Sequence, residues 1–249
     1  MTSIIKTRGI VLSSIRWHES SKIVTLYTEK LGKIKVIARG ALKDKSSFRG
    51  DLEALNELNV IISVKQARSL QILTETELAE TFNAIKSDWN RLPIALAILE
   101  LINEVFDEGH ADQIFYDFTI SVIRQSGELK TPIIAFWYFL LKLSSFLGFK
   151  PNLNSCQVCG TDRFDSDVFF SIEQGAVFCD NCARGAGLSI KINPVNFDFI
   201  RKLQDYHHQQ LKKFEEQSKL SFDFTNILID YLNHHIDSKI ELNSLSMFS

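Results

Sequence analysis

The sequence lacks the motifs that mark the commonest catalytic and cofactor-binding sites. Among its 249 residues there is no P-loop, H-E-x-x-H, G-x-S-x-G or G-x-G-x-x-G. These patterns form phosphate cradles, catalytic zinc sites, activated serines and dinucleotide sites respectively. Their absence argues against the common nucleotidases, metalloproteases, serine hydrolases and dehydrogenases, and we expect no enzymatic activity.

Long apolar runs are scarce as well. The opening stretch MTSIIKTRGIVLSS has neither a long apolar core nor a small-residue cleavage site, so it does not resemble a secretion signal. The most apolar stretch, IIAFWYFLLKLSSFLGF, is interrupted by Lys142 and two serines and falls short of a membrane span. With 45% hydrophobic and 23% charged residues, the composition predicts a soluble protein of the cytoplasm, with no membrane partner.

Positive charge is concentrated at the start of a chain whose formal net charge is only −2. Residues 1–50 carry eleven lysines and arginines against three acidic residues, and residues 51–80 carry two against six. The densest part is RGALKDKSSFRG at residues 39–50, where a glycine near each end favours a flexible loop. This asymmetry suggests a polyanionic partner, and the alternative is an ordinary solvated surface.

The first eighty residues have the pattern of short strands. They are rich in Ile, Val, Leu and Thr, with polar or turn residues between the runs. We expect strands at residues 8–15, 22–28, 33–39, 55–64 and 70–78. Five short strands are typical of a small closed or half-closed barrel such as the OB-fold, which often binds single-stranded nucleic acid.

The third predicted strand, KIKVIAR, alternates apolar and basic residues. Because side chains alternate across a strand, its two faces are expected to be different. They hold Ile34, Val36 and Ala38 on one side and Lys33, Lys35, Ile37 and Arg39 on the other. One face can pack into the barrel while the other presents three cations.

From about residue 81 the pattern is helical. Helices are expected from Pro93 to Gly109, over residues 112–125, from Thr131–Pro132 to Gly148, from Asn193–Pro194 onward, and over residues 222–236. We therefore predict an α+β protein, with an OB-fold domain at residues 1–80 and a helical domain at residues 81–249. The helical domain contains a different insert at residues 152–190.

All four cysteines lie in that insert, in the pattern C-x2-C-x19-C-x2-C formed by Cys156, Cys159, Cys179 and Cys182. Two residues between cysteines let a turn direct both sulfurs at one metal, and two such turns complete a tetrahedral shell. Disulfides would require an oxidising compartment, and a thioredoxin-like pair would require a βαβ context. The spacing predicts one structural zinc ion per chain, in a closed zinc knuckle that performs no catalysis.

Other candidate metal ligands are weaker. The pairs His207–His208 and His234–His235 make poor joint ligands, because neighbouring helix residues point about 100° apart. Asp162, Asp165 and Asp167 have some likeness to an EF-hand loop, but two phenylalanines follow where a glycine and a ligand are needed. We interpret the histidines as exposed helix residues and the aspartates as a solvated loop.

The N-terminal residues match a known family. The stretch GIVLSSIRWHESSKIVTLYTEKLGKIKVIARGALKDKSSFRGDLEAL resembles the beginning of the RecO family of bacterial DNA repair proteins. The landmarks are a GIVL first strand, Glu-Ser before KIVTL, a Gly-Lys hairpin, and a basic loop that begins Arg-Gly-Ala and ends Arg-Gly. The order of barrel, helices and four-cysteine insert is similar to the zinc-containing branch of that family, while the last fifty residues show little likeness.

The resemblance implies a nucleoid-associated recombination mediator. Such proteins bind single- and double-stranded DNA, anneal complementary strands, and act with RecR to load RecA onto strands coated by single-strand-binding protein. They also bind the acidic C-terminal tail of that coating protein. Cations of the helical half are possible partners for the tail, without any ranking among them: Arg124, Lys130, Lys142, Arg201 and Lys202.

The DNA-binding residues are then predicted from the basic segment. Lys33, Lys35 and Arg39 on the strand, with Lys43, Lys45 and Arg49 in the loop, would follow the phosphate backbone, and Arg8, Arg16 and Lys22 would widen the surface. Two aromatic residues, Trp17 and Phe48, either stack on bases or pack against the barrel rim.

Two other classes of function remain open at this stage. In a protein–protein adaptor, the basic surface would meet an acidic protein instead of DNA. A zinc-dependent or thiol enzyme would need an open coordination position or a cysteine of low pKa, and two matched cysteine pairs suggest neither.

Overall fold

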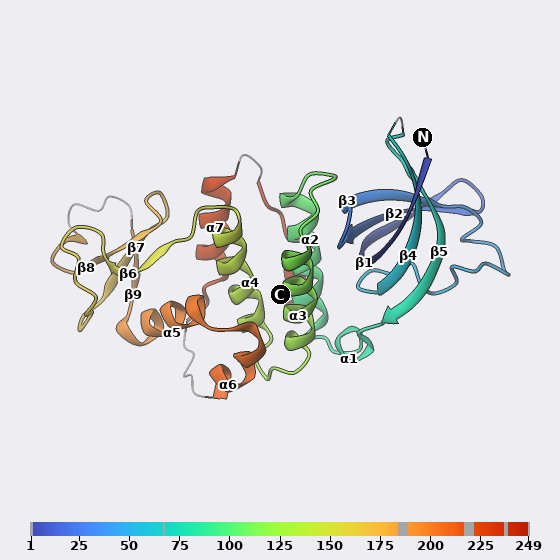
Figure 1. The fold of residues 1–249 in the computed structure, drawn as a ribbon. Helices are drawn as coiled ribbons and strands as arrows, with labels where there is room; N and C mark the ends of the chain where they lie inside the picture. The colour runs from blue at the N-terminus through green and yellow to red at the C-terminus, as the bar shows by residue number, and fades with distance from the viewer. Residues whose placement is uncertain (1, 67, 184–188, 217–221, 237–238, 249) are drawn as a thin grey trace. The chain divides into compact units, whose positions relative to one another are not determined.

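The computed structural model describes residues 2–66, 68–183, 189–216, 222–236 and 239–248. The chain divides into two compact units, Met1–Arg124 with Leu242–Ser249, and Gln125–Glu241. Figure 1 shows the elements of each unit. The domain limits expected from the sequence, 1–80 and 81–249, follow the change from strands to helices and stay a prediction.

The first unit contains five strands that close into a barrel. They are β1 (Thr2–Trp17), β2 (Ser21–Thr28), β3 (Gly32–Ala38), β4 (Glu57–Lys65) and β5 (Gln71–Glu80). The order around the barrel is β1-β2-β3-β5-β4, β1 also pairs with β4, and only β3 and β5 run parallel (Figure 1). This confirms the predicted five-stranded, OB-like arrangement.

Alternation along the strands builds the barrel core. Val24 faces Val36 across β2 and β3, and both are fully buried, as are Leu26 and Ala38. Strand β1 is long enough to pair with two other strands. Its residues 2–10 pair with β4, and its residues 9–17 pair with β2. A bulge between Val11 and Ser13 lies where β1 leaves β4, which is where strands bend in closed barrels.

The turn between β2 and β3 depends on a glycine. Gly32 has φ of +63°, and a Cβ there would lie 2.2 Å from the carbonyl oxygen of His110. Gly32 and Lys33 also form isolated bridges with Glu108. The segment after helix α2 (Leu92–Val105) is therefore seated directly on the hairpin.

The other elements of the first unit are α1 (Asn83–Lys86), α3 (Gln113–Ser126, its last two residues beyond this unit) and η3 (Ser244–Phe248). Helices α2 and α3 confirm the helices predicted from Pro93 to Gly109 and over residues 112–125, and Pro93 lies in the first turn of α2. Tyr27 on β2 packs against Phe106, Phe115 and Tyr116, so these residues cover one part of the outer barrel face.

The second unit is built around α4 (Ile133–Phe146), whose Trp137 packs against Phe199 and Phe224. The remaining helices are α5 (Pro194–Asp205), η2 (His208–Gln210), α6 (Leu211–Glu216) and α7 (Thr225–His235). Asn193 caps α5 by accepting the Asn196 backbone N–H, as its Asn-Pro start predicts. The start predicted at Thr131–Pro132 is displaced by one residue. Helix α4 begins at Ile133, directly after Pro132, and no side chain caps it.

The insert contains a small sheet that the sequence analysis missed. Its strands are β6 (Asn152–Cys156), β7 (Val168–Ser171), β8 (Ala176–Cys179) and β9 (Ile190–Ile192), in the order β6-β8-β7-β9. Each strand has five residues or fewer, too short for a clear alternation. Among all described helices, none combines the length and the apolar character needed to cross a membrane.

Candidate metal centre and nucleic-acid interface

The four cysteine sulfurs lie within 4.8 Å of one another. Two thiolates bound to one zinc at about 2.3 Å in tetrahedral geometry are about 3.8 Å apart, and the Cys159 and Cys179 sulfurs are 3.7 Å apart. That separation is far beyond the ~2.05 Å of a disulfide, and all four cysteines are free. The donor set and its spacing therefore fit a metal ion of the zinc type.

Each C-x2-C pair is held by its own turn. The Gly160 N–H donates to the Cys156 carbonyl, with Gly160 at φ of +72°, and the Cys182 N–H donates to the Cys179 carbonyl. The Cys179 N–H points at the Cys156 sulfur, at 3.4 Å. These backbone hydrogen bonds direct the four sulfurs toward one another.

The electrostatics of the cluster also favour a cation. Burial raises the pKa of Cys156, but backbone N–H groups, led by that of Cys159, outweigh burial and lower the pKa to about 6. The pKa of Cys182 is raised to about 12, mainly because its thiol hydrogen-bonds to Cys179. Four sulfurs this close lose their protons together only when a positive ion compensates their charge.

Apolar burial in the insert is divided between two places. Cys156 and Phe178 form a buried cluster with partly buried neighbours around them, and Val168, Phe170 and Val177 are buried on the strands. No other group of His, Cys, Asp or Glu in the described ranges has metal-binding geometry. Asp167 instead pairs with Lys191 at 2.6 Å, while His208 and His235 are half-buried, which corrects the prediction that all four paired histidines are exposed.

The cationic face of β3 is only partly open, contrary to the prediction. The ammonium group of Lys33 donates to the Asn103 carbonyl at 2.6 Å, and burial lowers its pKa. Lys35 pairs with Glu108 at 3.3 Å. The end of α2 therefore occupies the half of the strand face that carries these two lysines. Nothing in the sequence signalled this, because it depends on how the helix meets the barrel.

Arg8, which was predicted to widen the DNA surface, lies among carboxylates in the structure. Its guanidinium lies 2.6 Å from Asp117, 3.3 Å from Glu29 and 3.9 Å from Glu57, and it covers the Tyr116 ring at 5.2 Å. A guanidinium shared among three carboxylates joins the barrel to helix α3, so much of its charge is already compensated within the chain.

Six predicted cations remain. They are Arg16, Lys22, Arg39, Lys43, Lys45 and Arg49, and none takes part in an ion pair among the described residues. All but Lys22, which is half-buried, are exposed.

The basic loop that carries several of these cations is more ordered than its glycines suggest. Consecutive turns form through Lys43 N–H to Gly40, Ser46 N–H to Lys43, and Asp51 N–H to Phe48. The loop thus presents its cations from a hydrogen-bonded frame.

The two predicted aromatic residues differ in exposure. Phe48 is 7% exposed and belongs to the barrel core with Leu52 and Val36. The rim-packing alternative is therefore confirmed for Phe48, and it anchors the loop. Trp17 is 42% exposed beside His18 and stays a candidate for base stacking.

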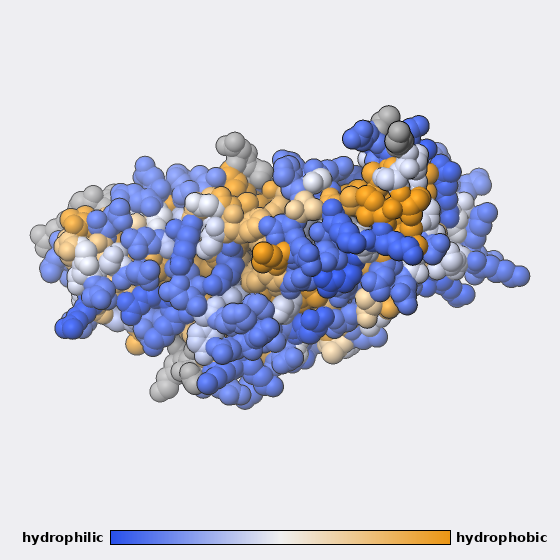
Figure 2. Space-filling model, in the orientation of Figure 1, coloured by the Kyte–Doolittle hydropathy of each residue, from blue (hydrophilic) through white to orange (hydrophobic). Residues whose placement is uncertain are grey.

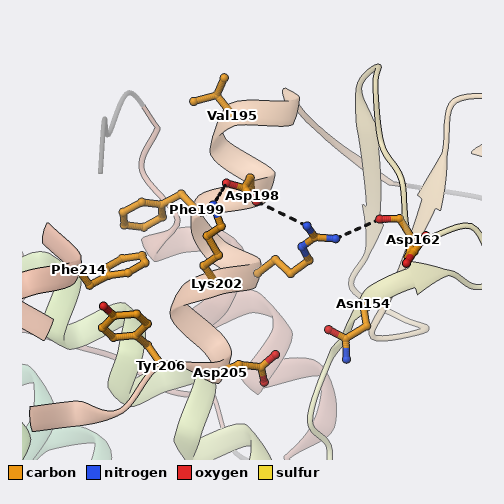
Figure 3. A pocket seen from close by; sticks show the side chains of 10 residues that line it. Asn154, Asp162, Val195, Asp198, Phe199, Lys202, Asp205, Tyr206 and Phe214 are labelled. Atoms are coloured by element: carbon orange, nitrogen blue, oxygen red, sulfur yellow. Dashed lines mark hydrogen bonds and ion pairs between the residues drawn. The ribbon is translucent and has the colours of Figure 1, made fainter. Parts of the chain in front are cut away.

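In the second unit, Arg201 and Lys202 are committed to ion pairs. An open cavity of about 940 Å³ is lined by charged and aromatic side chains of this unit. Figure 3 shows that Lys202 reaches Asp198 while Phe199, Phe214 and Tyr206 lie to one side. Lys202 pairs with Asp198 at 2.6 Å, and Arg201 reaches both Asp198 and the Asp162 carbonyl. This cavity shows no net cationic character that would favour a polyanion.

Comparisons with known proteins cover nearly the whole chain. Residues 1–82 match the family described as Recombination protein O N terminal, and residues 86–245 match Recombination protein O C terminal. DNA repair protein RecO of Alkaliphilus metalliredigens (strain QYMF) is 29% identical over 248 residues, 98% of each chain. The protein of the same name from Desulforamulus reducens is 26% identical over 238 residues, 96% of this chain and 92% of that one. That of Listeria monocytogenes serotype 4a (strain HCC23) is 32% identical over 181 residues, 71% and 68% of the two chains.

Proposed function

The chain belongs to the RecO family of DNA repair and recombination proteins, and on that premise we propose that it is a non-enzymatic recombination mediator whose barrel binds DNA through unpaired cations. It binds single- and double-stranded DNA and anneals complementary strands. It acts with RecR to load RecA onto strands coated by single-strand-binding protein, and it contacts the C-terminal tail of that protein. We further propose that it acts in the cytoplasm, at the nucleoid.

One observation carries the proposal: six cations near one end of the barrel have no ion-pair partner among the described residues, whereas Arg8 has three and Lys35 has one. Unpaired cations exchange condensed counterions for phosphates, and the released ions drive binding. Phosphate contacts carry no sequence information, so binding is expected to be largely independent of sequence. A mediator that acts on any damaged strand needs that property.

Strand annealing follows from the same charges. Two complementary strands repel each other through their phosphates, and a row of cations that neutralises both lowers that repulsion. Bases that are not read by side chains remain available for pairing. A salt-sensitive annealing activity is therefore expected, and it requires no nucleotide hydrolysis.

The metal centre has a structural part in this function. Cys156, Cys159, Cys179 and Cys182 would hold the zinc ion through four thiolates, which leaves no coordination position for water or substrate. When bound, the ion supplies folding free energy to the insert and no catalysis. The two C-x2-C turns bring the four sulfurs close together, as such a site requires.

The test is a titration of labelled oligonucleotides with the metal-loaded chain at several salt concentrations. In the variant K43A/K45A/R49A, we expect weaker binding, and a slope of log K against log salt that is smaller by about 2 for three lost single-strand phosphate contacts. A matched control, K130A/K212A/K213A, removes the same charge from exposed positions in the second unit. Equal affinities and slopes in the loop variant and the unmodified chain would reject the assigned interface.

The mediator steps need a separate measurement. Complementary oligonucleotides are annealed with and without a coat of single-strand-binding protein, and RecA filament formation is then followed with and without RecR. We expect annealing on coated strands by the unmodified chain and a defect in K43A/K45A/R49A. DNA binding without annealing or RecA loading would restrict the function to DNA binding alone.

A further inference from the structure

The basic loop at residues 39–50 is followed by a short segment, residues 51–56, that returns the chain to β4. Two apolar side chains fix the path of this segment, because Leu52 and Leu55 are both buried. Figure 2, in the orientation of Figure 1, shows mainly hydrophilic residues at the end of the barrel where the β3–β4 connection projects. Exposed cations and their buried support thus belong to one continuous stretch of chain.

Asn56 ends this segment, and both polar ends of its side chain are engaged. The residue is only 1% exposed. Its side-chain N–H groups donate to the carbonyl of Gly50 at 3.0 Å and to that of Asp51 at 2.8 Å. Its side-chain oxygen accepts from the ammonium group of Lys86, on α1. Because an ammonium group can only donate, Lys86 turns the amide nitrogen toward the two loop carbonyls.

The backbone around Asn56 is held as firmly as its side chain. The Val11 N–H donates to the Asn56 carbonyl at 2.9 Å, and the Leu55 N–H donates to the Val11 carbonyl at 3.0 Å. Leu55 has φ of +72°, which strains any residue that carries a side chain. Such strain persists only where the surrounding contacts dictate the conformation. Here those contacts determine where the loop ends.

A second hydrogen bond reaches the same point from β5. The Thr76 hydroxyl donates to the carboxylate of Asp51, so Asp51 is held through both its side chain and its carbonyl. Arg49 stands just before this support, with only Gly50 between them. The guanidinium of Arg49 has no ion-pair partner among the described residues. The direction of the Arg49 backbone is therefore set by the two residues that Asn56 binds.

We propose that Asn56 is a positioning residue for DNA binding and that Thr76 assists it. Asn56 is buried and makes no contact with DNA, but it holds the end of the basic loop so that Arg49 faces a phosphate. A cation on a fixed backbone loses less conformational freedom on binding than one on a mobile backbone. The inference rests on the proposed DNA-binding function, and it adds an uncharged, buried residue to that function.

The test measures how the oligonucleotide affinity of Asn56→Ala depends on salt. This substitution removes no charge, so a change in the salt slope follows from a cation that has lost its phosphate. We expect the slope of log K against log salt to be smaller in magnitude by about 0.7, the value of one single-strand phosphate. A substitution that only destabilised the fold would leave the slope of the folded molecules unchanged.

A double-mutant cycle identifies the cation concerned. In the unmodified chain, Arg49→Ala should reduce the magnitude of the slope by about 0.7. In the Asn56→Ala background, Arg49→Ala should change the slope and the affinity much less, because coupled residues are not additive. Arg16→Ala, which removes a cation of β1 outside the loop, should have the same effect in both backgrounds.

Asn59→Ala is the matched control. Asn59 lies on β4, and its side-chain amide donates to Glu77 instead of the loop, so its removal should leave the salt slope unchanged. Thermal midpoints verify that each variant is folded at the temperature of the titration. If Asn56→Ala does not fold, Thr76→Val takes its place in the cycle, because valine keeps the β-branch of threonine without the hydroxyl.

Two results would overturn the inference and leave the proposed function intact. One is a salt slope in the folded variant equal to that of the unmodified chain, and the other is full additivity with Arg49→Ala. If the unmodified chain bound no oligonucleotide at low salt, the proposed function would be rejected, and the inference with it.

Discussion

The barrel and the cysteine insert are both small sheets, but they are stabilised differently. The barrel has eleven buried residues in one apolar cluster and closes all its strands into a ring. The insert has four short strands, and around its cysteines only Cys156 and Phe178 form a buried cluster, although Val168 and Val177 on the strands are also buried. Apolar burial holds the barrel, whereas we expect the cysteine side of the insert to depend on a bound metal ion as well. The comparison predicts that each region fails under a different change.

Removal of the metal ion should have the largest effect, and that effect should be confined to the insert. Binding of structural zinc supplies about 10–16 kcal/mol of apparent free energy in small metal domains, so C156S/C159S or a strong chelator should unfold residues 152–180. Hydrogen exchange should show lost protection there and retained protection in β2 and β3, and metal analysis of the unmodified chain should give about one zinc per chain. If the insert kept its protection from hydrogen exchange without metal, it would be as independent of the metal as the barrel, and the comparison would fail.

A cavity in the barrel core should have the second-largest effect. Leu26 is fully buried, and Leu26→Ala should lower the free energy of unfolding of the barrel by about 2–5 kcal/mol. Denaturant titration measures this, while the zinc content should remain that of the unmodified chain. If Leu26→Ala instead released the metal, the two regions would not be independent.

A milder test concerns Phe48, which anchors the basic loop. Phe48→Leu keeps an apolar anchor and should cost about 1 kcal/mol of unfolding free energy, with oligonucleotide affinity unchanged. Trp17→Leu offers the matched aromatic substitution at an exposed site. A loss of DNA affinity in Phe48→Leu without any loss of stability would restore the base-stacking role.

The smallest expected effect is on the pH dependence of the barrel. Burial raises the pKa of Glu57, although the Tyr116 hydroxyl and Arg8 oppose the shift. A raised pKa in the folded state favours the protonated carboxyl, so its stabilising contribution is present at low pH and disappears as pH rises through the folded pKa. The unfolding free energy of the unmodified chain minus that of Glu57→Gln should therefore increase as pH falls from about 7 to about 4.5. A difference that is constant across this range would contradict the shift.

Local patterns predicted the fold well. The barrel strands follow from β-rich runs separated by turns, and α5 follows from its Asn-Pro start. The short strands of the insert escaped prediction because three to five residues give no reliable period. The cysteine cluster could be predicted because its spacing alone determines which side chains meet.

The cationic surface was less predictable than the metal centre. Sequence shows that Lys33, Lys35 and Arg8 are basic, but it does not show which carboxylates or carbonyls approach them from elsewhere in the chain. Phe48 has the same limitation, because a phenylalanine in a basic loop is equally compatible with a buried or an exposed position. Long-range contacts decided each of these roles.

Gly32 indirectly affects how much positive charge the barrel exposes. The backbone at His110 fills the space where any side chain at position 32 would stand, and the same segment brings Glu108 to Lys35. A methyl group at position 32 would push the segment around His110 away from the hairpin, and Glu108 would then separate from Lys35. A missing carbon atom thus helps to set how much positive potential the molecule shows to a polyanion.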